Sequence, residues 1–142
     1  FYNPVMNFLT QIDNLALIAL LLVSGAALFF PTLSTLISGK GLSPTEATIW
    51  MNRRKAAVLD LRPESDFKAG HLPGAKHLSA EQISSGIDKL KLDRKNPLIL
   101  VCHSGVSARK VVPELKKLGF SEVAVLDGGV QGWQAAALPL VK

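Results

Sequence analysis

The residues best suited to chemistry lie in Cys102–Arg109, where the single cysteine of the chain is followed by small residues. The apolar run Leu98–Val101 leads into Cys102, and a short apolar run bounded by turn residues predicts a buried parallel strand. The segment Arg109–Leu118 that follows has helical spacing. Strand, tight loop and helix form half of a βαβ unit, so we expect Cys102 at the carboxyl end of a strand, where open α/β sheets build their sites.

The composition of the loop favours a reactive thiolate. Gly105 permits backbone angles that other residues avoid, and the small side chains of Ser104, Ser107 and Ala108 let N–H groups turn inward around the sulfur. The free N–H groups at the start of a helix favour an anion, and the thiolate is the nucleophilic form of cysteine. The alternative is a buried cysteine that only packs at the end of a core strand.

Composition and charge exclude several other kinds of binding partner and site. The chain has 142 residues, 48% of them hydrophobic, and a formal charge of +5. Its basic residues are interleaved with acids and few aromatics accompany them, which argues against nucleic acid as a partner. One cysteine excludes an internal disulfide and a multi-cysteine zinc site, and the three histidines are not spaced as metal ligands. We therefore expect neither metal nor cofactor, and a reactive Cys102 would need an outside partner to complete turnover.

A membrane anchor is predicted near the N-terminus. Leu15–Phe30 is apolar on every face, and no Lys or Arg precedes Lys40. These residues span about 24 Å as a helix, and adding residues 31–37 reaches the ~30 Å of a hydrocarbon core, with a kink expected at Pro31. A core helix fits the uniform apolar character poorly, and a signal peptide would carry a positive n-region. Because the basic residues follow the span of about 14–37, the positive-inside rule places the C-terminal domain in the cytoplasm.

The rest of the chain alternates strands and helices, which predicts an α/β fold with a small parallel sheet flanked by helices on both faces. We expect a hinge-like linker at Ser38–Leu42, which separates a segment of residues 1–39 from a domain of residues 42–142. The expected strands end near residues 62, 78, 101 and 126. The expected helices cover about residues 43–52, 63–69, 81–90 and 109–118, with a last helix that carries Trp133.

Three groups of residues resemble the rhodanese family of sulfurtransferases. The first group is Asp60-Leu61-Arg62 with Phe67 and Gly70–Ala75, and the second is the loop Cys102–Ser107 with its helix. The third comprises Gly128-Gly129, Gly132-Trp133 and Leu138-Pro139. The order and spacing of these motifs carry the resemblance over residues 42–142. One membrane helix followed by one such domain also resembles the membrane-anchored rhodaneses of bacteria, which implies a single-pass protein of the bacterial inner membrane.

The resemblance implies a mechanism of sulfur transfer. Cys102 would accept a sulfane sulfur as a persulfide, and an acceptor thiol would then remove it. The resemblance places the substrate against the backbone N–H groups of the loop, which belong to His103, Ser104, Gly105, Val106, Ser107 and Ala108. Asp60, Arg62 and Arg109 would support the loop, with Glu64 or Asp66 as acidic partners of Arg62. Six residues separate Cys102 from Arg109, whereas cysteine phosphatases place five between nucleophile and arginine, so a phosphatase is disfavoured.

Two questions stay open at the level of sequence. Within the loop His103 is the single basic side chain, whereas rhodaneses that use thiosulfate often place Lys or Arg there, so the donor could be thiosulfate or a persulfide. The alternative function is a catalytically weak rhodanese-like module, tethered to the membrane, that binds a membrane protein partner.

Overall fold

The computed structural model describes residues 3–142, so the first two residues of the predicted N-terminal segment lie outside the description. Contacts between residues divide the chain into two units, residues 1–36 and residues 37–142. The division predicted from the sequence, residues 1–39 and 42–142, remains a proposal about domain organisation.

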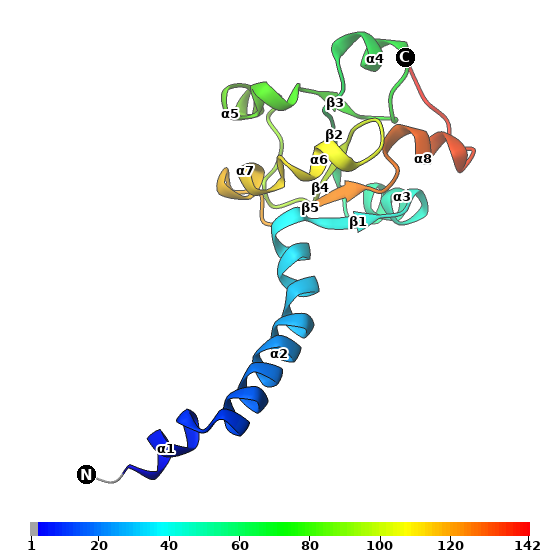
Figure 1. The fold of residues 1–142 in the computed structure, drawn as a ribbon. Helices are drawn as coiled ribbons and strands as arrows, with labels where there is room; N and C mark the ends of the chain where they lie inside the picture. Colours follow the sequence, from blue (N-terminus) through cyan, green and yellow to red (C-terminus); the bar gives the residue numbers. More distant parts are fainter. Residues whose placement is uncertain (1–2) are drawn as a thin grey trace. The chain divides into compact units, whose positions relative to one another are not determined.

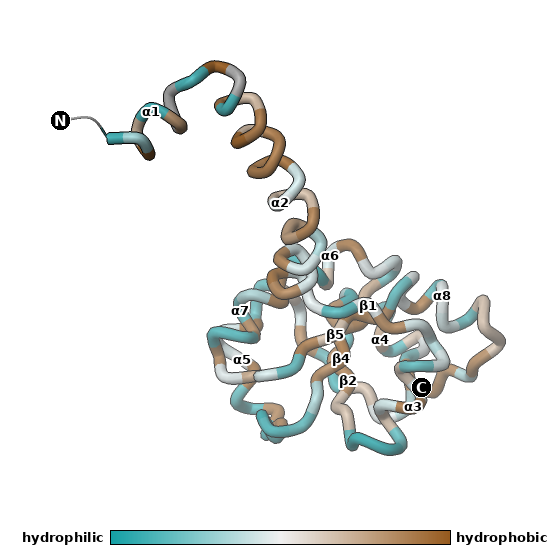
Figure 2. The backbone as a smooth tube through the Cα atoms, turned by 90° about the horizontal axis from the view of Figure 1, so that it is seen from below, coloured by the Kyte–Doolittle hydropathy of each residue, from teal (hydrophilic) through white to brown (hydrophobic). Residues whose placement is uncertain are grey.

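The N-terminal unit is helical (Figure 1). Helix α1 spans Pro4–Thr10, and helix α2 spans Ile12–Ser38, so its last residues belong to the second unit. Within α2, Asn14–Ser38 has a mean hydropathy of 2.3, which its largely hydrophobic colour in Figure 2 reflects. This segment is not buried inside the structure. The predicted span of 14–37 falls within this helix. The helix continues through Pro31, whose carbonyl accepts hydrogen bonds from the hydroxyl groups of Ser34 and Thr35.

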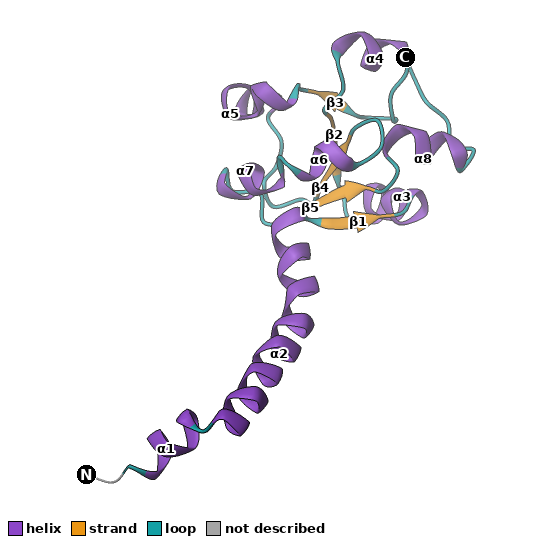
Figure 3. Cartoon of the chain, viewed as in Figure 1, coloured by secondary structure: helices purple, strands orange, loops and turns teal. Residues whose placement is uncertain are grey.

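The second unit is built on a five-stranded parallel sheet (Figure 3). Its order is β1-β5-β4-β2-β3. The strands are β1 (Lys40–Leu42), β2 (Ala57–Asp60), β3 (Lys76–His77), β4 (Leu98–Val101) and β5 (Val123–Leu126). Apolar residues cluster on both faces, so the predicted parallel sheet with helices on each side is confirmed.

Strand β4 lies at the centre of this sheet and is completely buried. Side chains alternate between the faces of a strand. Leu98 and Leu100 pack on the face that carries α5 and α7, with Cys102 continuing the same alternation. Ile99 and Val101 pack on the opposite face, against residues of α3 and α8. Cys102 therefore follows the most buried strand, with its side chain on the α5/α7 face.

The hinge-like linker expected at Ser38–Leu42 is wrong. Its last three residues, Lys40–Leu42, form strand β1, which pairs with β5 at the edge of the sheet, and Leu42 is fully buried. Gly39 has φ +78°, and a Cβ atom there would lie 2.9 Å from the Val123 carbonyl oxygen. The glycine that suggested flexibility instead allows the backbone to approach β5 closely.

The predicted helix start at Ser43 is confirmed. Helix α3 spans Pro44–Arg53, and its capping box pairs the Ser43 side chain with the Glu46 backbone and the Glu46 side chain with the Ser43 backbone. The hydrogen bond from the Ser43 backbone N–H lowers the pKa of the Glu46 carboxyl. Helix α4, Glu64–Ala69, also forms where the sequence predicts it.

Two predicted helices are broken into shorter pieces. The segment 81–90 forms η1 (Ala80–Gln82), α5 (Ile83–Gly86) and η2 (Ile87–Leu90) instead of one helix. Gly86 is a poor helix former, and a Cβ atom there would lie 2.6 Å from a Leu78 methyl group, so close packing opposes a residue that would extend the helix.

The helix expected at 109–118 begins earlier and is divided. Helix α6 spans Val106–Arg109, and helix α7 spans Val112–Lys117. Pro113 has no N–H group to bond to Arg109, but it is tolerated in the first turn of α7, where that donor would have no partner. The last helix, α8, spans Gly129–Ala135 and carries Trp133 as predicted.

Candidate active site

Cys102 directly follows β4, as the sequence predicts, and its side chain is 3% exposed. The Sγ atom accepts a hydrogen bond from the Gly105 backbone N–H at 2.9 Å. Gly105 adopts φ +92°, and a Cβ atom there would lie 3.0 Å from the Leu126 carbonyl oxygen. This position therefore requires glycine for both its backbone angle and its space, and it aims an N–H group at the sulfur.

The six predicted substrate-binding residues form one turn from Cys102 into α6. Gly105 and Ala108 are buried, whereas His103, Ser104, Val106 and Ser107 are exposed. The first N–H groups of a helix have no partner within the helix. The turn thus combines a nearly buried sulfur, one N–H group already bonded to it and further donors of the first helical turn beside it, which is an arrangement suited to an anionic sulfur.

The start of α8, which follows the end of strand β5, supports this loop through two hydrogen bonds. The Val130 N–H donates to the Cys102 carbonyl at 2.9 Å, and the Gln131 N–H donates to the His103 carbonyl at 3.3 Å. Gly129 has φ +56°, and a Cβ atom there would overlap both of these carbonyl groups. The sequence shows the glycine pair at 128–129 as a turn, but the contact between that turn and the loop is a tertiary feature.

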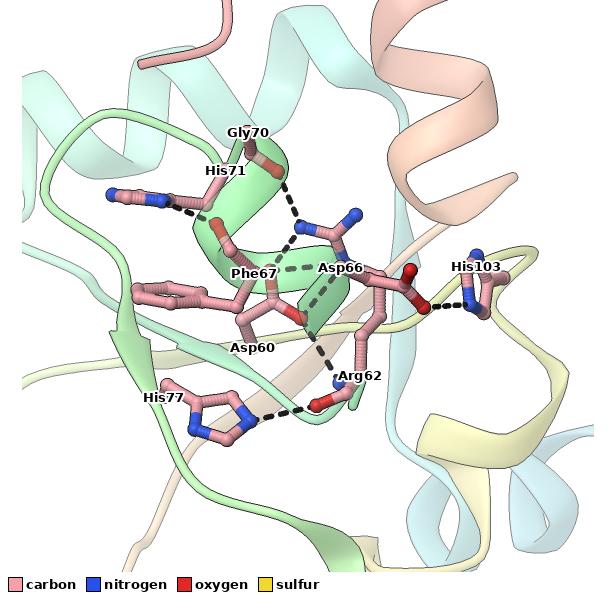
Figure 4. A network of polar contacts seen from close by, with 8 residues as sticks. All are labelled: Asp60, Arg62, Asp66, Phe67, Gly70, His71, His77 and His103. Atoms are coloured by element: carbon pink, nitrogen blue, oxygen red, sulfur yellow. Dashed lines mark hydrogen bonds and ion pairs between the residues drawn. The ribbon is translucent and has the colours of Figure 1, made fainter. Parts of the chain in front are cut away.

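Asp60 and Arg62 form an ion pair at the end of β2 (Figure 4). Their side chains are 0% and 6% exposed, and the Arg62 Nε and Nη2 groups donate to the Asp60 carboxylate. Arg62 Nη2 also donates to the Gly70 carbonyl at 2.7 Å. The expectation that Glu64 or Asp66 pairs with Arg62 is wrong, because Asp60 is buried beside Arg62, whereas the side chains of Glu64 and Asp66 are exposed.

Two histidines brace the same turn. His77 Nε2 lies 2.7 Å from the Arg62 carbonyl, and His71 Nδ1 lies 2.9 Å from the Phe67 carbonyl. The His71 ring also stacks on Phe67, with centroids 3.9 Å apart. His71 is thus hydrogen-bonded within the fold, as the sequence suggests for a histidine that follows a glycine turn.

Asp66 is the site residue whose contact the sequence does not reveal. Its Oδ2 atom lies 3.0 Å from Nε2 of His103, so α4 contacts the residue next to Cys102 (Figure 4). The side chains of Asp66 and His103 are 41% and 59% exposed. On the same helix, the hydrogen bond from Lys68 lowers the pKa of Glu64, which keeps that carboxyl ionised. The loop therefore contacts α4 through the Asp66 carboxylate.

The Arg109 side chain is hydrogen-bonded to groups other than the Cys102 sulfur. Its Nη1 group donates to the Gly39 carbonyl at 3.3 Å, and its Nη2 group donates to Asp127 Oδ1 at 2.9 Å. Arg109 thus ties α6 to the strand ends of β1 and β5. His103 remains the single basic side chain among the six loop residues.

Two hollows adjoin the loop, one on each side. The first, of about 330 Å³, is lined by Arg62, Asp66, Ala69, Gly70, His103, Val130, Gln131, Gln134 and Leu140. The second, of about 380 Å³, is lined by Leu61, Pro63, Ser79, Ala80, Glu81 and Ser107. Among residues 3–142, leaving aside the undescribed side chains, no group of three or more His, Cys, Asp or Glu residues is placed to hold a metal ion.

Comparisons with known proteins agree with this geometry. The family described as "Rhodanese-like domain" matches residues 43–136. The chain is 35% identical over 144 residues to the uncharacterized protein YibN of Escherichia coli strain K12, covering 99% of this chain and 98% of that protein. It is 32% identical over 99 residues to the thiosulfate sulfurtransferase GlpE of Shewanella oneidensis, covering 70% of this chain and 96% of the relative.

Solved structures show the same fold. A thiosulfate sulfurtransferase from Pseudomonas aeruginosa superimposes with a TM-score of 0.66 at 29% identity, covering 72% of this chain and 19% of that one. A rhodanese-related protein from Thermoplasma volcanium gives a TM-score of 0.61 at 22% identity, covering 72% of this chain and 97% of that one, and this likeness concerns the fold. Through its second unit, the chain belongs to the rhodanese-like domain family of sulfurtransferases.

Proposed function

We propose that this protein is a membrane-anchored sulfurtransferase that carries sulfane sulfur as a persulfide on Cys102. The observation that carries the proposal is the hydrogen bond from the Gly105 N–H to Cys102 Sγ, within a turn of donors at the end of the central strand. Such preorganised donors stabilise negative charge on an atom held among them. A persulfide places its charge on the outer sulfur, one bond beyond Sγ.

The reaction has two displacement steps. In the first, the Cys102 thiolate attacks the outer sulfur of the donor, an S–S bond forms to Cys102, and the donor leaves as a thiolate, or as sulfite when the donor is thiosulfate. In the second, an acceptor thiolate attacks the outer sulfur of the Cys102 persulfide and restores the Cys102 thiolate. The sulfur atom is passed on in both steps, so no external oxidant or reductant is needed.

We propose a carbon-bound persulfide as the preferred donor. The loop carries no Lys or Arg, Arg109 is bound to Gly39 and Asp127, and the Asp66 carboxylate lies beside His103. Few positive groups near the loop would balance the two negative charges of a thiosulfate dianion, whereas a persulfide anion carries a single negative charge. Because one relative is named a thiosulfate sulfurtransferase, thiosulfate is the donor with which a persulfide should be compared.

Intact-mass analysis tests the carrier function. The full chain in detergent is exposed to thiosulfate and, separately, to glutathione persulfide, with Cys102→Ser as control. We expect one added sulfur on the wild type, greater occupancy with the persulfide, and removal of that sulfur by cyanide or a thiol. If neither donor adds sulfur, the alternative of a tethered binding module takes the place of the enzyme.

We also propose that α2 crosses the bacterial inner membrane once. Its Asn14–Ser38 segment is long and apolar enough, and the basic residues Lys40, Arg53, Arg54 and Lys55 all follow it. The positive-inside rule then places the sulfur site in the cytoplasm. Carbonate extraction should leave the full chain in the membrane pellet, and protease added to intact spheroplasts should not cleave the second unit. Release of the protein by carbonate would refute the anchor.

A further inference from the structure

We propose that the second unit binds the anionic phospholipid headgroups of the membrane through the end of its sheet at which the strands begin. The inference rests on the proposed membrane anchor and adds a second contact between the protein and the bilayer. We call this surface the basic end of the sheet. Its exposed residues are Lys40, Arg53, Arg54, Lys55, Lys95 and Lys117.

The direction of the strands brings these residues to one end of the sheet. All paired strands are parallel, so the strands begin at one end of the sheet and finish at the other. Lys40 is the first residue of β1, and residues 53–55 lead into β2. Lys95 precedes β4, and Lys117 is the last residue of α7, which precedes β5. Four strand starts therefore contribute positive charge to the same surface.

Side-chain contacts join these segments. The Trp50 ring of α3 lies between two cations, with Lys40 Nζ 5.6 Å and Arg54 Cζ 4.3 Å from its centroid. These contacts connect the start of β1 with the segment that leads into β2. Arg94 Nε donates to the Leu118 carbonyl at 2.8 Å, which connects the segment before β4 with the segment before β5. The basic end is thus one surface made by the folded sheet.

Most of the charge at the basic end is not neutralised by acids. Glu122, which precedes β5, pairs with Arg54. Asp93 accepts a hydrogen bond from the Lys95 backbone N–H within its own turn. Among the residues whose side chains are described, those of the basic end that form no ion pair are Arg53, Lys55, Lys95 and Lys117. These four cations are available to an anionic partner.

The opposite end of the sheet has a different charge balance. The acids in the segments that follow the strands are Glu46, Glu64, Asp66, Glu81 and Asp127. The bases Arg62, Lys68 and Arg109 at this end are each paired with an acid. An anionic surface is therefore attracted to the end at which the strands begin.

The position of the proposed span favours a lipid surface as the anionic partner. Helix α2 ends at Ser38, which belongs to the second unit, and β1 begins at Lys40. Two residues of chain reach at most about 7 Å, which is within the Debye length of about 8 Å at physiological salt. Tryptophan is enriched at membrane interfaces, and Trp50 is partly exposed among these cations. The basic end is thus held next to headgroups by the chain itself.

This contact orients the sulfur site. Cys102 follows the end of β4, so its loop belongs to the opposite end of the sheet. With the basic end against the headgroups, the loop is turned away from the bilayer. Water-soluble donors and acceptors then reach Cys102 from the cytoplasm.

Quenching of Trp50 fluorescence tests the contact. The full chain is reconstituted into vesicles of phosphatidylcholine, or of equal parts of phosphatidylcholine and phosphatidylglycerol, each with a trace of lipid that carries a nitroxide on its headgroup. We expect stronger quenching with phosphatidylglycerol, and loss of the difference at high salt, because salt screens exposed charges. Trp50→Phe keeps only the buried Trp133 and measures its share of the signal. Equal quenching in the two lipids would overturn the proposal.

Charge variants locate the contact on the protein. Arg53→Gln, Lys55→Gln removes two unpaired charges of the basic end. Lys110→Gln, Lys142→Gln is the matched control, because it removes two exposed charges away from the strand starts. Each lost charge weakens attraction to an anionic surface about fivefold, so the ratio of docked to undocked protein should fall about 25-fold in the first variant. An equal fall in the control would overturn the assignment to the basic end.

Two further measurements complete the test. Persulfidation of Cys102 by glutathione persulfide should be equally fast in the wild type and in Arg53→Gln, Lys55→Gln in phosphatidylglycerol vesicles, whereas a slower wild type would overturn the orientation. Binding of a single-stranded oligonucleotide, together with equal quenching in the two lipids, would assign the basic end to nucleic acid instead. If carbonate releases the chain, the proposed anchor fails, and the difference in quenching still decides whether the basic end binds headgroups.

Discussion

Gly129 offers a direct test of how the loop at Cys102 is supported. Gly129 has φ +56°, and a Cβ atom would overlap the carbonyl groups of Cys102 and His103. Gly129→Ala must therefore move the start of α8 away from the loop. The movement breaks the hydrogen bonds from the Val130 and Gln131 N–H groups to these two carbonyls.

Gly74 is the matched control, because it has φ +74° but nothing lies within 4 Å of its added Cβ atom. The left-handed angle costs alanine about 1–2 kcal/mol at either position, and about 0.4–1 kcal/mol is recovered by restricting the unfolded chain. Gly74→Ala should therefore lose about 1 kcal/mol of unfolding free energy. At Gly129 the two broken hydrogen bonds add about 0.5–1.5 kcal/mol each, for a total loss of about 2–4 kcal/mol.

The assay is urea unfolding of the full chain in detergent, followed by tryptophan fluorescence. Trp133 is 3% exposed on α8, so its emission reports on the region that moves. The persulfidation rate is measured in parallel, and we expect it to fall for Gly129→Ala but not for Gly74→Ala. If the two variants lose the same free energy of unfolding, to within ~0.5 kcal/mol, the contact between α8 and the loop does not stabilise the fold.

Three further variants probe the site and its support. Asp60→Asn should cost about 3–5 kcal/mol in urea unfolding, because it leaves the Arg62 charge buried without a counter-ion, and a loss below ~1 kcal/mol would contradict that burial. Trp133→Phe removes the hydrogen bond from Nε1 to the Pro139 carbonyl and also shrinks a buried ring system, so unfolding should lose more than the ~1 kcal/mol of the bond alone, whereas no change would show that neither contact stabilises the fold. Ser107→Arg adds a cation to the loop and should raise the kcat/KM for thiosulfate about tenfold relative to that for a persulfide, since a hydrogen bond to a charged group contributes about 1.5–3 kcal/mol. An unchanged ratio of the two kcat/KM values would show that charge at the loop does not select the donor.

The burial of Arg62 explains why its partner was predicted incorrectly. Glu64 and Asp66 are close in sequence, and both belong to helix α4, which begins after the turn. Asp60 is the last residue of β2 and is fully buried, so its charge requires a partner in the same place. Glu64 and Asp66, which reach water, pair with Lys68 and His103 instead.

The local sequence determined the elements and the position of the cysteine. Apolar runs specify β2, β4 and β5, Ser43 and Glu46 specify the start of α3, and Gly105 after Cys102 specifies a tight turn, because each depends on neighbours within a few residues. The uniform apolar character of residues 15–30 likewise specifies a long helix.

The tertiary structure decided which distant groups meet at the loop. It made the glycines of Ser38–Leu42 part of a sheet edge, placed α8 beneath the Cys102 carbonyl, and brought Asp66 to His103. Within residues 3–142, it also left one nitrogen of Arg62 without a hydrogen-bond partner beside a hollow. These features depend on strand order and on space between packed elements, and sequence spacing does not encode the distance between residues that only the folded sheet brings together.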